Sequence, residues 1–213
     1  LLSKAFPEET APFIVFKRNA YSWNNDLSCS VDIEELERSW KIASSDTLPN
    51  EERLAHYNRA LDLYHGQFLP KSGAEEWTLP LRAYYRSIYL ECVDKACVLL
   101  LNANRPGEVI RICGQATSLE PFEERLHELL IRGYLEAENH TQALAHYYQV
   151  TNMFYSELGI KVSDSITNLY REITKSVSNV EADLRIIEQQ LHESEAVPGA
   201  FFCDYEVFRN IYR

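Results

Sequence analysis

The stretch LLNANRPGEVIRICGQA (residues 100–116) is followed 34 residues later by YLEAENHTQALAHYYQV (residues 134–150). The two copies share an apolar pattern rather than identical residues. The matching positions are Leu100, Val109, Ile110, Cys113 and Ala116 in the first copy, and Tyr134, Ala143, Leu144, Tyr147 and Val150 in the second. Apolar residues spaced three and four apart indicate a helix with one buried face. The sequence therefore predicts a repeated unit built from paired helices.

A period of 34 residues is typical of tetratricopeptide helix pairs. Pro121 ends the first unit at the position where that pattern has a proline. The match is degenerate, because Cys97 and Ile131 occupy positions that usually carry Gly or Ala, where two helices approach closely. We predict an all-α fold, a tetratricopeptide-like helical repeat array with a short N-terminal β-hairpin remnant.

Helical periodicity extends beyond the two copies. Asp32 is expected to cap the first helix together with Glu35, as in a capping box. Further helices are predicted from Pro49 to Gly66, from Thr78 or Leu79 to about 104 with Pro80 in the first turn, from Ser163 to about Val177, and over 180–193. The remaining tail ends in the aromatic-rich segment 201–213, which we expect to dock on another surface.

Residues 1–30 have a different pattern. Phe13–Phe16 and Tyr21–Trp23 are rich in aromatic and β-branched residues, and the polar segment Lys17–Ala20 separates them. This pattern predicts two short strands joined by a turn. The alternative is an extended arm packed on the helices.

Charge and hydropathy restrict the partners. The 213-residue chain has 21 Lys+Arg against 32 Asp+Glu, a formal net charge of −11. Clustered cations grip phosphate backbones, so this portion is a poor nucleic-acid binder by itself. No apolar run approaches the roughly 20 residues of a membrane span, and we predict no membrane partner. The N-terminus lacks a secretory signal pattern. The chain begins with Leu1 rather than a methionine and stops at Arg213 inside a predicted amphipathic helix, so we expect a fragment of a longer protein.

The five cysteines have no metal-type spacing. Cys92, Cys97 and Cys113 fall on apolar helix faces, where a thiol acts as a small hydrophobe. We expect reduced cysteines and a cytoplasmic location.

The sequence assembles no catalytic set. The six histidines lie on different predicted helices without partnered spacing, so surface or edge positions are expected for them rather than metal ligation. Paired glutamates fall near helix starts, where the helix dipole favours a carboxylate. Phosphate-binding glycine loops and nucleophile elbows are absent from the sequence. We therefore predict no enzyme activity, no cofactor and no metal, and we assign the tyrosines to helix packing.

Several motifs occur in a specific order. They are YNRALDLYHGQFLP (residues 57–70) followed by Glu76-Trp77, then LEPFEERLHELL (residues 119–130), ALAHY (residues 143–147) and ELGIKVS (residues 157–163). This succession resembles the bacterial transcriptional activator domain over about residues 32–177. Pro80 departs from the family pattern, which has a charged run after the tryptophan, and the tail after residue 180 lies outside it.

The resemblance implies a layout. In the antibiotic regulatory protein class of activators, a tetratricopeptide-like domain follows an OmpR-type winged-helix DNA-binding domain. Residues 1–30 would then be the wing hairpin that ends the winged helix, residues 31–178 the activator domain, and residues 179–213 a C-terminal helical extension. Lys17 and Arg18 in the turn are the candidates for DNA contacts. The remaining winged-helix sequence would precede Leu1.

The positions that match the family motifs are expected to be structural: Tyr64, Gly66, Leu69, Pro70, Trp77, Pro121, Glu124, Arg125, His127, Ala143, Leu144, Tyr147, Glu157, Leu158, Gly159 and Ser163. The implied function is a regulatory module of a bacterial transcription factor that mediates self-association, effector sensing or RNA polymerase contact. DNA would be bound through the missing winged-helix domain. A stand-alone tetratricopeptide scaffold that grips a peptide is the alternative, and a helical enzyme is a third hypothesis.

Overall fold

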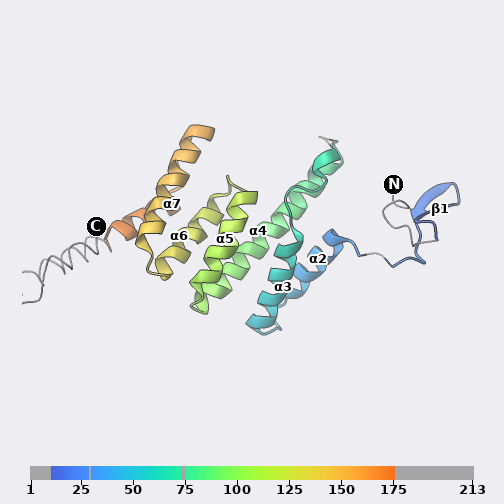
Figure 1. Ribbon diagram of the computed structural model, residues 1–213, viewed down its shortest axis with the longest axis horizontal. Helices are drawn as coiled ribbons and strands as arrows, with labels where there is room; N and C mark the ends of the chain where they lie inside the picture. The colour runs from blue at the N-terminus through green and yellow to red at the C-terminus, as the bar shows by residue number, and fades with distance from the viewer. Residues whose placement is uncertain (1–10, 29, 73–74, 176–213) are drawn as a thin grey trace, which may run out of the picture. The chain divides into compact units, whose positions relative to one another are not determined.

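The computed structural model describes residues 11–28, 30–72 and 75–175. The chain forms two compact units, Leu1–Leu99 and Leu100–Arg213, and helix α4 crosses the boundary between them. Apart from one hairpin, the described elements are helices (Figure 1). The predicted all-α array with an N-terminal β-hairpin is confirmed. The helix predicted over 180–193 and the aromatic tail lie outside the described residues.

The N-terminal hairpin pairs β1 (Ile14–Lys17) with β2 (Ala20–Trp23) in antiparallel register. Its two turn residues, Arg18 and Asn19, have φ angles of 52° and 60°. Two-residue hairpin turns require this left-handed region because their twist then matches that of the strands. The hairpin prediction is therefore correct, and the alternative of an extended arm is wrong. Lys17 belongs to the strand rather than the turn, since it pairs with Ala20.

The first helical pair consists of α2 (Asp32–Ala43) and α3 (Asn50–Leu63). The side chains of Leu36, Tyr57 and Ala60 are buried. The capping box predicted at Asp32 is wrong: the cap residue is Val31, and Asp32 Oδ1 accepts the N–H of Ile33 at 2.8 Å. The carboxylate of Glu35 instead accepts hydrogen bonds from Arg59 on α3, with Nη2 at 2.6 Å.

The connection from α3 to α4 (Thr78–Asn102) contains the short 3₁₀ turn η1 (Pro70–Ser72). Tyr64 stacks on Tyr89 of α4, with ring centroids 4.0 Å apart. Gly66 has a φ of +115°, a conformation that residues with a Cβ rarely adopt. Arg82 on α4 donates hydrogen bonds to the carbonyls of Phe68 and Leu69, both at 2.9 Å. The predicted start of α4 at Thr78, with Pro80 in its first turn, is confirmed.

The second unit contains the end of α4, then α5 (Pro106–Leu119), α6 (Glu124–Glu136) and α7 (His140–Met153). A single π turn, η2 (Phe154–Leu158), continues α7, and residues 164–175 are helical again. The core of the second unit combines residues from α6, α7, η2 and the helix 164–175. They are Ile131, Ala143, Val150, Phe154, Ile166, Leu169 and Ile173. The predicted helix from Ser163 is therefore confirmed within the described residues.

The three cysteines predicted on apolar faces, Cys92, Cys97 and Cys113, are fully buried. Burial raises the pKa of the Cys92 thiol to about 12. Cys29 and Cys203 lie outside the described residues. No described helix combines the length and hydropathy that crossing a membrane would need.

Helices α5 and α6 approach closely at Gly133. A Cβ at this position would lie 3.1 Å from Val109 Cγ1 and 3.2 Å from Ile110 Cγ1. A Cβ at Gly114 in α5 would meet nothing within 4 Å.

We expect opposite effects at these two glycines. Gly133→Val should lower the free energy of unfolding by about 1–3 kcal/mol, because the branched side chain overpacks the α5–α6 contact. Gly114→Ala should raise it by about 0.5–1 kcal/mol, because alanine is the better helix former. Urea unfolding followed by circular dichroism measures both changes. Equal effects at the two positions would contradict the close approach.

Candidate functional site

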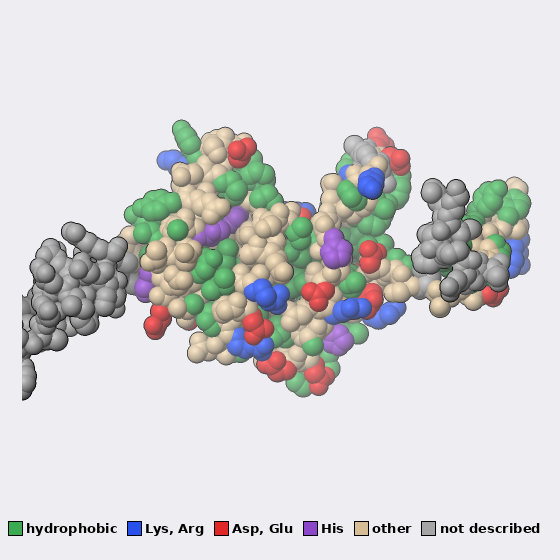
Figure 2. All heavy atoms as spheres, in the orientation of Figure 1, with side chains coloured by type: hydrophobic (Ala, Val, Ile, Leu, Met, Phe, Trp, Pro, Cys, Tyr) green, Lys and Arg blue, Asp and Glu red, His purple; other side chains and the backbone are tan. Residues whose placement is uncertain are grey.

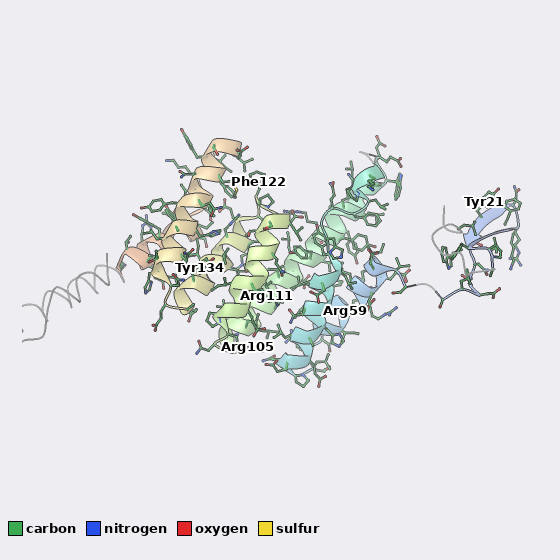
Figure 3. The ribbon with its side chains drawn as sticks, in the orientation of Figure 1. Tyr21, Arg59, Arg105, Arg111, Phe122 and Tyr134 are labelled. Carbon is green, nitrogen blue, oxygen red and sulfur yellow. The ribbon has the colours of Figure 1, made fainter. Side chains whose placement is uncertain are left out.

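Three motif segments meet at one edge of the second unit: the α5–α6 loop, the end of α7 with η2, and the start of the helix 164–175. The Glu124 carboxylate at the first turn of α6 accepts the backbone N–H of Ser163, with Oε2 at 2.9 Å. Phe122 in the α5–α6 loop contacts Phe154 of η2 edge-on, with ring centroids 6.2 Å apart. Figure 3 labels Phe122 on this loop, beside the end of α7. Residues 39 positions apart in sequence therefore share one edge.

Glu128 fastens α6 to the helix 164–175. Its carboxylate Oε1 lies 2.9 Å from Arg125 Nη1 and 3.1 Å from Arg132 Nε. Burial raises the pKa of the Glu128 carboxyl, whereas hydrogen bonds from Arg125, Ser165 and Arg132 lower it. Together the hydrogen bonds outweigh burial, and the pKa is lowered. The carboxylate is thus ionised at neutral pH. Arg125, which the sequence predicted to be structural, takes part in this ion pair.

Two histidines from different helices form a hydrogen-bonded pair. His127 Nε2 lies 2.8 Å from the carbonyl oxygen of Pro121, and His127 Nδ1 lies 3.1 Å from His146 Nε2. A carbonyl oxygen only accepts, so in neutral His127 the proton sits on Nε2 and Nδ1 accepts from His146. These two hydrogen bonds fix the tautomers of both histidines. They also connect His146 on α7 with His127 on α6, and His127 with the α5–α6 loop.

The histidine pair stays neutral at neutral pH. Burial lowers the pKa of His127, although the Pro121 carbonyl and the carboxylates of Glu124 and Glu123 oppose that shift. Burial and the neighbouring His127 lower the pKa of His146 to about 4. The ring centroids are 5.2 Å apart, so the two nitrogens face each other nearly head-on, as in an N–H···N hydrogen bond. Among the described residues, no group of three or more His, Cys, Asp or Glu could hold a metal ion.

The π turn ends at Gly159, whose φ of +69° lies in the left-handed region. There the N–H groups of Gly159 and Ile160 bond the carbonyls of Tyr155 and Phe154, respectively. Glycine tolerates this conformation without steric cost, which explains its place in the ELGIKVS motif. The turn leaves Tyr155 70% exposed and Leu158 46% exposed.

The other predicted site residues lie on several elements of the two units. Lys17 and Arg18 lie exposed on the hairpin of the first unit. Tyr64, Gly66, Leu69, Pro70 and Trp77 belong to the α3–α4 connection, where Leu69 and Trp77 are exposed. On α7, Ala143 is fully buried, Leu144 packs against the core, and Tyr147 stacks on Tyr170 with centroids 4.6 Å apart. Glu157 is exposed on η2.

Sequence reasoning missed several of the contacting residues at this edge, among them Phe122, Phe154, Glu128 and His146. The expectation of a surface or edge position is wrong for His127, which is 4% exposed. One feature of the sequence could have indicated this contact: His127 and His146 lie on predicted neighbouring helices of one repeat. Sequence spacing of 19 residues gave no sign that the rings would meet.

Comparisons with known proteins identify what the chain resembles. The family model of the bacterial transcriptional activator domain matches residues 31–174. Among solved structures, Mycobacterium tuberculosis EmbR in complex with a low affinity phosphopeptide is similar, with a TM-score of 0.54 and 18% sequence identity. The likeness covers 84% of this chain and 49% of the EmbR chain, and at this identity it shows the fold alone. No curated protein matches the chain in sequence.

The histidine pair makes stability depend on pH. A histidine with a folded pKa below its unfolded value of about 6.5 binds its proton preferentially in the unfolded state. Stability is therefore complete above about pH 6.5 and falls as pH decreases toward the folded pKa of His146, about 4.

We expect His146→Gln to flatten this dependence. The glutamine amide does not titrate in this range and still offers an N–H to His127 Nδ1. Thermal unfolding between pH 7 and pH 5 measures the slope, with the exposed His65→Gln as the matched control. If the stability of His146→Gln changes with pH as steeply as that of His65→Gln, the result contradicts the pairing of the two histidines.

Proposed function

The chain belongs to the bacterial transcriptional activator domain family, and we propose that it is the regulatory and protein-interaction module of a bacterial DNA-binding transcriptional regulator. The observation that carries this proposal is the family match over residues 31–174, which spans the helical array in both units. The array uses its apolar interior for packing and exposes large side chains such as Trp77 and Tyr155. Such side chains are typical of protein contacts.

The domain layout is part of the proposal. Residues 1–30 would be the wing of a winged-helix domain, residues 31–178 the activator domain, and residues 179–213 a C-terminal extension. The hairpin with Lys17 and Arg18 at its tip supports the wing assignment, since exposed cations there suit phosphate contacts. DNA would be bound through the rest of the winged helix, and the protein would act in the cytoplasm.

The proposed partners are proteins: a second copy of the chain, or RNA polymerase. The net charge of −11 favours protein surfaces over phosphate backbones. Binding rather than catalysis also suits the best-defined polar cluster, because each histidine of the His127–His146 pair is engaged by the other. EmbR was determined with a phosphopeptide; for this chain a peptide partner is the alternative function, that of a tetratricopeptide scaffold.

Light scattering coupled to size-exclusion chromatography, together with binding to purified RNA polymerase, tests the proposal. We expect the chain either to gain mass with concentration as a dimer or to bind immobilised polymerase with an affinity of about micromolar order. Unlabelled chain should compete for the polymerase, and heat-denatured chain should not. A monomer at every concentration that also ignores the polymerase would contradict the proposed function.

A further inference from the structure

The α5–α6 loop holds an apolar side chain in solvent on a rigid frame. Phe122 is 47% exposed although its ring contacts the buried ring of Phe154. The carbonyl of the preceding Pro121 is fixed by His127, whose own ring meets Phe154 edge-on at 87°. The loop is therefore held at both its backbone and its side chain, and Phe122 is presented to solvent rather than folded into the core.

The end of α7 extends this apolar surface. It reaches beyond the α5–α6 loop (Figure 1) and carries Tyr155 and Leu158 on η2. Leu158 follows Phe154 by four residues, which places both on similar sides of the turn. Leu119, at the end of α5, is three residues before Phe122 and is 39% exposed. We call Leu119, Phe122, Tyr155 and Leu158 the loop–η2 surface.

Carboxylates are close in sequence to the residues of the loop–η2 surface. Glu120 and Glu123 flank Pro121 and Phe122 in the loop, and Glu157 lies exposed between Tyr155 and Leu158. Figure 2 shows hydrophobic side chains at the free end of α7, together with one acidic and one basic side chain. An apolar centre with a charged rim is the usual composition of a protein interface. The rim carries three glutamates against one exposed lysine, Lys161. This negative balance, in a chain of net charge −11, disfavours a second copy and favours a positively charged occupant.

We propose that the loop–η2 surface docks a basic amphipathic segment of a protein partner, with the apolar face of the segment on Phe122 and Leu158 and its Lys or Arg side chains on the glutamates. This inference rests on the proposed function, because it states the chemistry of one partner of the module. Apolar anchors at three- and four-residue spacing on a helix would match the groups that the surface presents.

The test uses the full 213-residue chain and a fluorescein-labelled amphipathic peptide with leucine on one helical face and lysine on the other. We expect saturable binding in fluorescence anisotropy that weakens as salt is added, and none to the same peptide with glutamate in place of lysine. Phe122→Ser should weaken binding by about tenfold or more, the loss typical of a central apolar anchor. Phe16→Ser, the same change at an exposed hairpin residue, should leave it unchanged.

A second variant keeps the test valid if Phe122→Ser disturbs folding. Glu157→Gln removes one rim charge at an exposed position and should lower the affinity a few-fold, whereas the control Glu136→Gln at the opposite end of α6 should not. Binding that neither Phe122→Ser nor Glu157→Gln weakens would overturn the proposal.

Other occupants would appear as distinct outcomes. A dimer that Phe122→Ser converts to a monomer would assign the surface to a second copy and overturn the proposal. Protection of Tyr155 from acetylation in the monomeric chain would assign it to the tail of the same chain, with the same consequence. If the chain binds polymerase but Phe122→Ser leaves the affinity for the basic peptide unchanged, this inference fails while the proposed function stands.

Discussion

The hydrogen bond from the backbone N–H of Ser163 to the carboxylate of Glu124 joins residues 39 positions apart at the edge on which the site depends. The helices of the array bury apolar side chains against one another, and such a surface is buried only if the next helix lies over it. Glu124 and Glu128 set the position of the last described helix, which brings Ile166 and Ile173 onto the core beside Ile131. Two carboxylates on one helix thereby determine where the helix 164–175 begins.

The same edge explains why polar groups are buried in an otherwise apolar unit. His127 and His146 satisfy each other, and His127 also satisfies the Pro121 carbonyl, so these groups avoid the cost of unpaired burial. The benefit is geometric: a short loop becomes fixed to two helices, and Phe122 is held at the surface. A fixed loop loses little conformational freedom on binding, which favours recognition by the surface that it forms.

Periodicity predicted the helices, the hairpin and the start of α4 because these follow from local spacing and from the restrictions on proline. Motif residues such as Gly159 were found because a backbone conformation demands them. The partners of individual side chains were not predicted. The cap at Asp32 failed because Glu35 reaches Arg59 on the neighbouring helix, and the pairing of His127 with His146 depends on how α6 and α7 pack. A single sequence does not specify those distances.

Hydrogen exchange of the Ser163 amide in the full chain tests the central claim that Glu124 fixes the last described helix. If the carboxylate holds this N–H, the amide should exchange about tenfold more slowly in the native chain than in Glu124→Ala, as expected for one hydrogen bond of about 1–1.5 kcal/mol. Amides within α5 should be unaffected by the substitution. Equal exchange rates at Ser163 in the two proteins would contradict the account.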